Sequence, residues 1–311
     1  MSDTPETDHD PAASNLVDAS SRSVGRFHVG PVGFGCWRFT GSSVAEATAL
    51  IEAALDAGCN LIDTADVYGL DWGGTGFGSC EALLGEVLAA TPSLRNRMVL
   101  ATKGGIWPGR PYDSSDAYLR AACEASLDRL QVDNIDLYQV HRPDMFTHPG
   151  ALAETLTSLR DRGLVDEVGV SNFTPAQTEA LQAHLDFPLA STQPELSAVQ
   201  LGALRDGTLD LAMRTDLAVL AWSPLAGGAL ATGDGIRPEL LVVLDSLAQR
   251  EQTERSTIAL AFVLAHPSAP VAIIGTQHAA RIAAAVQAAS VHLDRADVYA
   301  IVQASEGVPL P

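Results

Sequence analysis

The sequence predicts an α/β fold in which eight parallel strands, each followed by a helix, close into a (β/α)8 TIM barrel. Short apolar runs typical of buried strands alternate along the chain with segments of helical periodicity, which is the pattern of repeated strand–helix units around a parallel sheet. Eight such runs occur, and eight is the number of strands in this barrel. They span residues 29–34, 60–62, 98–102, 135–140, 165–170, 189–192, 217–221 and 271–274.

Helix signals stand between the predicted strands. Ser43 precedes Glu46 by three residues, the spacing of a capping box, and an apolar face follows. Ser115 precedes a second apolar face of helical spacing, and Pro175 after Thr174 is typical of the first turn of a helix. We therefore expect helices to begin after Ser43, Ser115 and Thr174.

An open, doubly wound sheet is the main alternative, because it also alternates strands with helices. After the first predicted strand, residues 33–38 read Gly-Phe-Gly-Cys-Trp-Arg, so the third glycine of the GxGxxG fingerprint is missing. No acidic partner for a ribose follows at the usual distance. Eight units without this fingerprint favour the closed barrel, whose active sites are built at the carboxyl ends of the strands.

Size and charge restrict the class of protein. With 311 residues and 47% hydrophobic content, the chain is long enough for one large domain, although two smaller domains would also fit. We expect a disordered acidic N-terminal tail over residues 1–22 and a barrel domain over residues 23–311. The formal charge of −19 argues against nucleic acid and anionic membranes as partners, because like charges repel. Signal-peptide and membrane-spanning patterns are lacking, so we expect a cytoplasmic protein.

The cysteines and histidines give no sign of a metal site. Cys36, Cys59, Cys80 and Cys123 lack the CxxC pairing or other spacing of metal ligands, and a large domain does not need disulfide bonds. The histidines show no clustering either. We predict free thiols and no metal.

Four polar residues stand at or just past the ends of predicted strands: Asp63, Tyr68, Lys103 and His141. Because the carboxyl ends of parallel strands meet at one rim, we expect these side chains to come together. Reduction of a carbonyl group requires hydride delivery to carbon and a proton or hydrogen bond at the oxygen. Tyrosine can donate that proton. The alternative is a structural ion pair between Asp63 and Lys103, with the other two as ordinary rim residues; the joint placement favours catalysis.

Several segments, in their joint order, resemble those of the aldo-keto reductases from about residue 29 to residue 289. The matching segments are Gly33-Phe34-Gly35-Cys36-Trp37, Leu61 to Gly69, Ala101-Thr102-Lys103-Gly104-Gly105, Asp136 to His141, Val168 to Phe173, Trp222-Ser223-Pro224-Leu225 and Ile273-Ile274-Gly275. The resemblance implies a (β/α)8 barrel that binds a nicotinamide cofactor without a Rossmann domain.

The resemblance also implies roles for the four polar residues. Tyr68 would be the general acid, and the nearby cation Lys103 would bring its pKa down from about 10 toward the working pH. Asp63 would keep the buried Lys103 charged and oriented. His141, when neutral, would donate a hydrogen bond to the carbonyl oxygen.

For the cofactor, the resemblance places Ser171, Asn172 and Gln193 at the nicotinamide carboxamide. Trp222 would stack on the nicotinamide ring, although an ordinary core aromatic is the alternative. Further cofactor contacts are implied in three loops, at Gly35, Cys36 and Trp37, at Ser223, Leu225 and Gly227, and at Gly275, Thr276, Gln277 and Arg281.

Arg281 favours NADP(H) over NAD(H), which stays possible, because a guanidinium can bind the phosphate on the adenosine ribose. The chain departs from the family at the adenine end. It has Gln277 where many members carry Lys or Arg, and Ala284-Ala285 where many carry Glu-Asn. A solvated charge on a helix is the alternative for Arg281.

Trp37, Trp107 and Arg142 are the predicted substrate-binding residues, because they lie in or beside the loops after the first, third and fourth strands. The glycine-rich loop from Gly69 to Gly78 is either a mobile flap over the site or a surface loop.

Two function classes follow. The first is an NADP(H)-dependent oxidoreductase that reduces the carbonyl of an aldehyde or ketone, or oxidises an alcohol in reverse. The second is a non-catalytic, cofactor-sensing regulatory subunit, which the complete set of four residues disfavours. A barrel isomerase or metal-dependent hydrolase would need more ligands at the strand ends. The expected partner is a small-molecule carbonyl substrate, and the acidic surface is compatible with a monomer or weak homo-oligomer.

Overall fold

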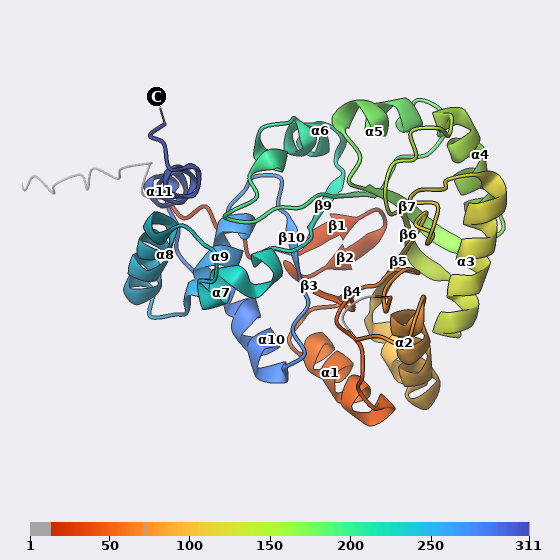
Figure 1. Ribbon diagram of the computed structural model, residues 1–311, viewed down its shortest axis with the longest axis horizontal. Coiled ribbons are helices and arrows are strands. Elements are labelled where there is room, and N and C mark those ends of the chain that lie inside the picture. The colour runs from red at the N-terminus through yellow and green to blue at the C-terminus, as the bar shows by residue number, and fades with distance from the viewer. Residues whose placement is uncertain (1–13, 71–72, 311) are drawn as a thin grey trace, which may run out of the picture.

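Eight parallel strands form a closed barrel with helices around its outside (Figure 1). The structure is a computed structural model that describes residues 14–70 and 73–310. In spatial order the barrel strands are β10 (Val271–Ile274), β3 (Val32–Gly35), β4 (Leu61–Asp63), β5 (Val99–Gly104), β6 (Ile135–Val140), β7 (Val165–Ser171), β8 (Ser191–Gln193) and β9 (Ala218–Ala221). The predicted (β/α)8 fold is confirmed, and the open sheet is excluded.

A β-hairpin that the sequence analysis missed precedes the barrel. β1 (Arg22–Val24) pairs antiparallel with β2 (Phe27–Val29), and Figure 1 shows both strands across the centre of the barrel. Val24 and Val29 are buried among the first residues of the barrel strands. The first predicted strand is therefore wrong at its start, because Val29 belongs to the hairpin and β3 begins at Val32.

The helices begin where the capping signals indicate. Ser43 and Glu46 form a capping box, Ser115 accepts from the amide of Tyr118, and Thr174 forms a second capping box. The α-helices are α1 (Val44–Asp56), α2 (Ser79–Ala90), α3 (Asp116–Leu130), α4 (Pro149–Asp161), α5 (Pro175–Gln182), α6 (Thr208–Thr215), α7 (Ala229–Thr232), α8 (Pro238–Arg250), α9 (Arg255–Leu264), α10 (Ala279–Val286) and α11 (Arg295–Glu306). Within residues 14–70 and 73–310, the 3-10 helices are η2 (Pro92–Arg97), η3 (Gly202–Leu204), η4 (Ala226–Gly228) and η5 (Gln287–Ser290).

Apolar side chains fill two layers of the fold. The larger layer lies between the barrel strands and the helices and includes Phe34, Ile51, Leu84 and Tyr138. The smaller layer closes the amino-terminal end of the barrel against the hairpin. Each fully buried aliphatic or aromatic side chain contributes roughly 1.5–3 kcal/mol to stability. In the described part of the chain, no helix is both long and apolar enough to cross a membrane.

The segment just before the hairpin packs on the helices, which corrects the prediction of a disordered tail up to residue 22. Val17 is buried, and the amide of Leu16 donates to the carbonyl of Leu293 at 2.8 Å. Asn15 bonds to the same segment through its side chain, from Nδ2 to the carbonyl of Val291 at 3.3 Å. Residues 1–13 of the predicted tail lie outside the described residues.

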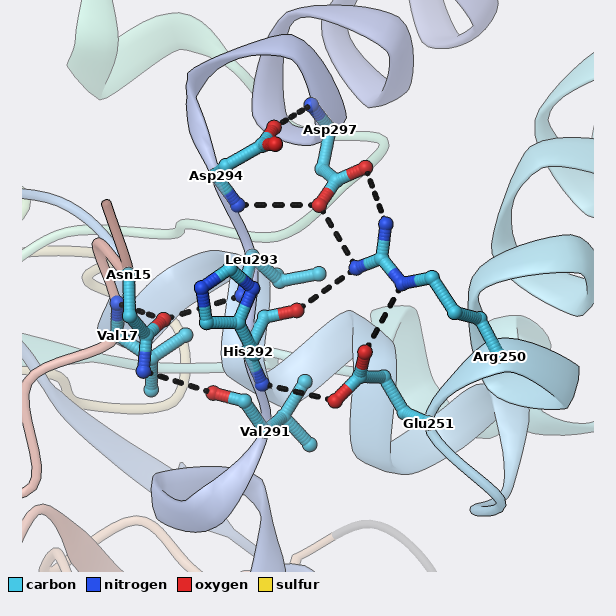
Figure 2. A network of polar contacts seen from close by, with 9 residues as sticks. All are labelled: Asn15, Val17, Arg250, Glu251, Val291, His292, Leu293, Asp294 and Asp297. Carbon is cyan, nitrogen blue, oxygen red and sulfur yellow. Dashed lines mark hydrogen bonds and ion pairs between the residues drawn. The ribbon is translucent and has the colours of Figure 1, made fainter. Parts of the chain in front are cut away.

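A polar network holds the chain segment from Val291 to Leu293, on which Asn15 and Val17 lie (Figure 2). Arg250, at the end of α8, donates from both terminal nitrogens to Asp297 in α11, at 2.9 and 2.8 Å. It also donates to Glu251 at 2.9 Å and to the carbonyl of His292 at 2.8 Å. The network joins α8 to α11, which run side by side (Figure 1).

Candidate active site

The four candidate residues lie at one rim because their strands run parallel and end there. Asp63 is the last residue of β4, Lys103 lies next to the end of β5, and His141 directly follows β6. β5 and several other strands extend one or two residues further than predicted, so Lys103 is held within the strand ladder. The turn after β4 returns Tyr68 to the rim, and the amide of Asp66 within it donates to the carbonyl of Lys103 at 3.0 Å.

Lys103 and Asp63 form a buried ion pair. Lys103 is 0% exposed and donates from Nζ to Asp63 Oδ2 at 2.6 Å and to the carbonyl of Thr64 at 2.7 Å. The other carboxylate oxygen of Asp63 accepts from the side-chain amides of Gln193 at 3.0 Å and Gln139 at 3.3 Å. A buried ion pair is tolerated only when hydrogen bonds satisfy its remaining atoms. Both oxygens of Asp63 are satisfied here.

Tyr68 packs on this ion pair. The Nζ atom of Lys103 lies 5.0 Å from the centroid of the Tyr68 ring. Burial raises the pKa of Tyr68 above its ordinary value, although the Lys103 ammonium acts in the opposite direction. The expected lowering is therefore not the net effect, since burial and the negative charge of Asp63 outweigh the lysine. Tyr68 is a neutral phenol at neutral pH, which is the form that can donate a proton.

His141 stands beside Tyr68 as a neutral imidazole. The two rings meet edge to face, with centroids 5.8 Å apart. Burial lowers the pKa of His141 well below its ordinary value, and the positive charges of Lys103 and Arg142 lower it further. Its Nδ1 atom is buried and has no hydrogen-bond partner among the described residues. A neutral ring has one N–H donor to offer.

A cavity of about 1120 Å³ extends from these residues to the first turns of α10. Asp63, Tyr68 and His141 line it. Most residues predicted to bind cofactor or substrate also line it: Gly35, Trp37, Arg142, Ser171, Asn172, Gln193, Trp222, Ser223, Leu225, Gly227, Gly275, Thr276, Gln277 and Arg281. Cys36 and Trp107 are not among its lining residues. Cys36 is fully buried.

A chain of hydrogen bonds orders the polar wall next to the rim. The indole nitrogen of Trp222 donates to Asn172 Oδ1 at 3.1 Å, and Asn172 Nδ2 donates to Ser171 Oγ at 2.8 Å. Ser171 Oγ in turn donates to the carbonyl of Gln193 at 3.0 Å. Asn172 has a φ of 59°, a left-handed conformation that asparagine tolerates better than most residues. The side chains expected at a carboxamide are thus already held in place by one another.

The loop after β9 forms the next part of the wall and is tied across the cavity. Gly227, with φ of 67°, and Gly228, with φ of 106°, give the loop its left-handed turns. Arg38, from the loop after β3, donates to the carbonyl of Gly227 at 2.7 Å. Sequence reasoning missed Arg38, because no local pattern indicates that these two loops meet.

At the far end of the cavity, the residues fit a polar ligand. Both amide atoms of Gln277 are buried and have no hydrogen-bond partner among the described residues. Arg281 lies exposed in α10. The carboxylate residue Glu254, which sequence reasoning also missed, lines the same cavity. A nucleotide offers hydroxyl, amine and phosphate groups that can satisfy such atoms.

Trp107 lies on the rim rather than in the cavity wall. Its ring packs on Phe77, with centroids 5.3 Å apart, and on Tyr118 at 6.0 Å, and it is 42% exposed. Phe77 belongs to the glycine-rich loop from Gly69 to Gly78, of which residues 71–72 lie outside the described residues. The contact with Phe77 attaches this loop to the loop after β5, and the contact with Tyr118 attaches the loop after β5 to α3.

A sequence profile of the "Aldo/keto reductase family" matches residues 31–306. The chain belongs to this family. The aldo/keto reductase fold accounts for the closed barrel and for the cavity at the carboxyl ends of its strands.

Two curated relatives of this aldo/keto reductase carry the same name. It is 49% identical over 286 residues to the 6-dehydroglucose reductase of Novosphingobium aromaticivorans, a match that covers 91% of this chain and 94% of that protein. It is 32% identical over 274 residues to the 6-dehydroglucose reductase of Agrobacterium fabrum, covering 84% of this chain and 89% of that protein.

A solved structure shows the same fold. It is a crystal structure of the thermostable aldo-keto reductase Tm1743 with the inhibitor epalrestat, which matches this aldo/keto reductase with a TM-score of 0.79 and 23% identity. The match covers 92% of this chain and 99% of that chain. Family and relatives make the protein an oxidoreductase of the carbonyl-reducing class, and they do not favour the regulatory subunit.

Proposed function

We propose that the protein reduces the carbonyl group of an aldehyde with NADP(H), or oxidises the corresponding alcohol in reverse, with Tyr68 as general acid and base. The observation that supports this most is the placement of the neutral Tyr68 over the buried pair of Lys103 and Asp63, beside a neutral His141, at one end of a long cavity. This arrangement holds a proton at the place where a carbonyl oxygen would enter.

When bound, a nicotinamide cofactor would supply the hydride. Tyr68 then gives its hydroxyl proton to the carbonyl oxygen as negative charge develops there, and the neutral His141 donates a second hydrogen bond. The ammonium of Lys103 stabilises the phenolate that Tyr68 becomes, until solvent returns the proton. Asp63 keeps Lys103 charged and directed toward the ring.

The wall beside Tyr68 would orient the nicotinamide ring. Trp222 offers an aromatic face, and its hydrogen bond to Asn172 fixes the plane of the indole. Ser171 and Asn172 would meet the carboxamide. Gln193 also donates to Asp63, so it contributes to the ion pair as well as to this wall.

We propose NADP(H) as the preferred cofactor and NAD(H) as a weaker one. Arg281 supports the preference, because its exposed guanidinium at the cavity end can bind a ribose phosphate in bidentate fashion. Glu254 would repel that phosphate, and it could accept hydrogen bonds from the free ribose hydroxyls of NAD(H). NAD(H) is therefore also proposed to bind. The unpartnered amide of Gln277 suits either nucleotide.

The names of the two relatives suggest a sugar aldehyde such as 6-dehydroglucose as substrate. Arg142 lines the cavity next to His141 and lies 5.8 Å from the Trp222 ring, where its guanidinium can donate to sugar hydroxyls. The half-exposed Trp37 adds an aromatic surface. No charged group on the substrate is required by this wall.

The direct test is an assay of NADPH and NADH oxidation with 6-dehydroglucose, glyceraldehyde and simple aliphatic aldehydes. We expect turnover with NADPH and the highest kcat/KM for the sugar aldehyde. Nucleotide binding without turnover on any of these carbonyls would contradict the proposal and support the sensing subunit. Higher kcat/KM for aliphatic aldehydes would reject only the sugar substrate.

A further inference from the structure

A second polar cluster lies between the turn after β4 and the helices α2 and α3. It contains two carboxylates and one cation: Asp66, Glu81 and Arg129. The side chains of Asp66 and Glu81 are each 0% exposed. Asp66 stands in the chain between Asp63 and Tyr68, so it belongs to the turn that carries Tyr68. The proposed reaction uses none of the three.

Arg129, the cation of this cluster, forms an ion pair with Glu81. Arg129 donates from Nε to Glu81 Oε2 at 2.8 Å, and its Nη2 lies 2.7 Å from the same oxygen. The hydroxyl of Thr102 donates to the other oxygen of Glu81. Asp66 has no ion pair within the described ranges, and its Oδ1 is buried without a hydrogen-bond partner there. One carboxylate is therefore matched by a cation and the other is not.

The two contacts of the Tyr118 hydroxyl indicate whether Tyr118 or Asp66 is the donor between them. Its oxygen lies 2.9 Å from the carbonyl oxygen of Ile106 and 3.4 Å from Asp66 Oδ2. A tyrosine has one hydroxyl proton, and the shorter contact to Ile106 takes it. The contact to Asp66 is then a hydrogen bond only if Asp66 is the donor, which requires its protonated form.

The hydroxyl of Tyr138 and the carboxyl of Asp66 both lie near Gly104. A Cβ atom added to Gly104 would stand 2.1 Å from Tyr138 Oη and 3.5 Å from Asp66 Oδ2. Tyr138 Oη is buried and unpartnered among the described residues. The Asp66 carboxyl thus has Tyr118 and Tyr138 near it, and the backbone amide of Val67 also donates to it. None of these neutral groups stabilises an ionised carboxylate as a paired cation would.

We propose that Asp66 is a positioning residue that stays a neutral carboxylic acid in the folded protein and donates its proton to Tyr118, which holds Tyr118 on the carbonyl of Ile106. Ile106 lines the cavity, and the ring of the next residue, Trp107, packs on Tyr118. The turn that carries Tyr68 and the loop at the substrate rim are thereby joined. The protonation state of Asp66 is independent of the proposed function, and only the effect on substrate binding rests on it.

The electrostatics agree with this geometry. Burial raises the pKa of Asp66 well above its ordinary value, and the charge of Glu81 raises it further. Arg129 and the hydrogen bond from the backbone amide of Val67 act in the opposite direction, but Arg129 is paired with Glu81. The groups that face Asp66 are Glu81 from α2, Tyr118 and Arg129 from α3, and Tyr138 from β6.

Asp66→Asn tests the protonation state without an assay of turnover. Asparagine has the shape of the neutral acid and can still donate to Tyr118. Above roughly pH 4 the unfolded Asp66 loses its proton while the folded one keeps it, so the wild type loses stability as pH rises. We expect the Tm of Asp66→Asn, relative to that of the wild type, to increase as the pH rises above about 4. Parallel Tm curves, or a deficit of the variant that grows with pH, would overturn the proposal.

Glu81→Gln is the matched control. It makes the same chemical change on the carboxylate that holds the cation, so it leaves Arg129 without its partner, and we expect a lower Tm at every pH. Infrared spectroscopy adds a direct readout: the C=O band of a protonated carboxyl at neutral pH should be present in the wild type and lost in Asp66→Asn. A wild type without this band would refute the proposal, whatever the protein catalyses.

The positioning role is tested by kinetics with a second pair of variants. Asp66→Leu fills the site but cannot donate to Tyr118, so we expect the KM for the carbonyl substrate to rise about threefold or more with little change in kcat. Asp66→Asn should restore the wild-type KM. A wild-type KM in Asp66→Leu, or an equally raised KM in Asp66→Asn, would contradict the positioning role.

Discussion

Lys103 is a charged group whose side chain is fully buried. Two acceptors and one aromatic ring make this tolerable, since Asp63 and the carbonyl of Thr64 accept hydrogen bonds from Nζ and the face of Tyr68 covers it. Strand ends in the sequence predict that Lys103 and Asp63 meet. They do not predict that Gln139 and Gln193 share the other oxygen of Asp63, because that depends on the stagger of β6 and β8 around the barrel.

Asp63→Asn should cost both stability and turnover. It leaves a buried ammonium without its carboxylate, a loss of about 3–5 kcal/mol in the free energy of unfolding. Urea denaturation measures this loss, and NADPH oxidation measures the fall in kcat.

The matched control for that variant is Asp136→Asn. Asp136 is also buried and paired, with Arg95 at 2.7 and 2.8 Å, but it does not line the cavity. It should lose stability while the folded fraction keeps its kcat. An equal fall of kcat in both variants would show that general destabilisation explains the effect.

His141 predicts a pH dependence of stability with a definite sign. Burial lowers the pKa of His141 in the folded protein, whereas the unfolded chain takes up a proton below about pH 6.5. This residue therefore destabilises the fold as pH falls below about 6.5. We expect His141→Gln to lose less Tm than the wild type between about pH 7 and pH 5. A wild type and variant with the same pH dependence would show that His141 is charged in the folded protein.

At the scale of elements, local signals were sufficient for the barrel strands and for the starts of α1, α3 and α5. Capping residues and apolar periodicity act over a few residues, so they can be recognised in the chain. The hairpin of β1 and β2 was missed because its strands are only three residues long and alternate with polar residues. Contacts between helices are also invisible locally, and α2 against α3 is an example.

Gly85 sets the approach of α2 to α3. A Cβ atom at this position would lie 2.0 Å from the carbonyl oxygen of Arg129, so the two helices would have to separate. Alanine favours an isolated helix over glycine by about 1 kcal/mol, yet we expect Gly85→Ala to destabilise the protein by about 1–3 kcal/mol. Thermal and urea unfolding would measure this change. A more stable Gly85→Ala would mean that α2 and α3 are not held at this distance.

At the scale of the whole molecule, barrel closure brings loops from opposite ends of the sequence to one cavity. The sequence predicted most of its wall, because strand ends converge in this fold. Cys36, which is fully buried, and Trp107, which packs on other rings at the rim, are not among the lining residues. Nothing in the sequence indicated the neutral carboxyl proposed for Asp66, since that role depends on the packing of α2 and α3 over the turn.

The central claim is that Tyr68 supplies the proton while the rest of the cavity binds the nucleotide. The most direct measurement is the rate of NADPH oxidation by Tyr68→Phe with a sugar aldehyde, with the dissociation constant for NADPH determined by fluorescence on the same sample. We predict that kcat falls by about 10²-fold or more, while the dissociation constant stays within about threefold of the wild type. Undiminished turnover by Tyr68→Phe would contradict the account.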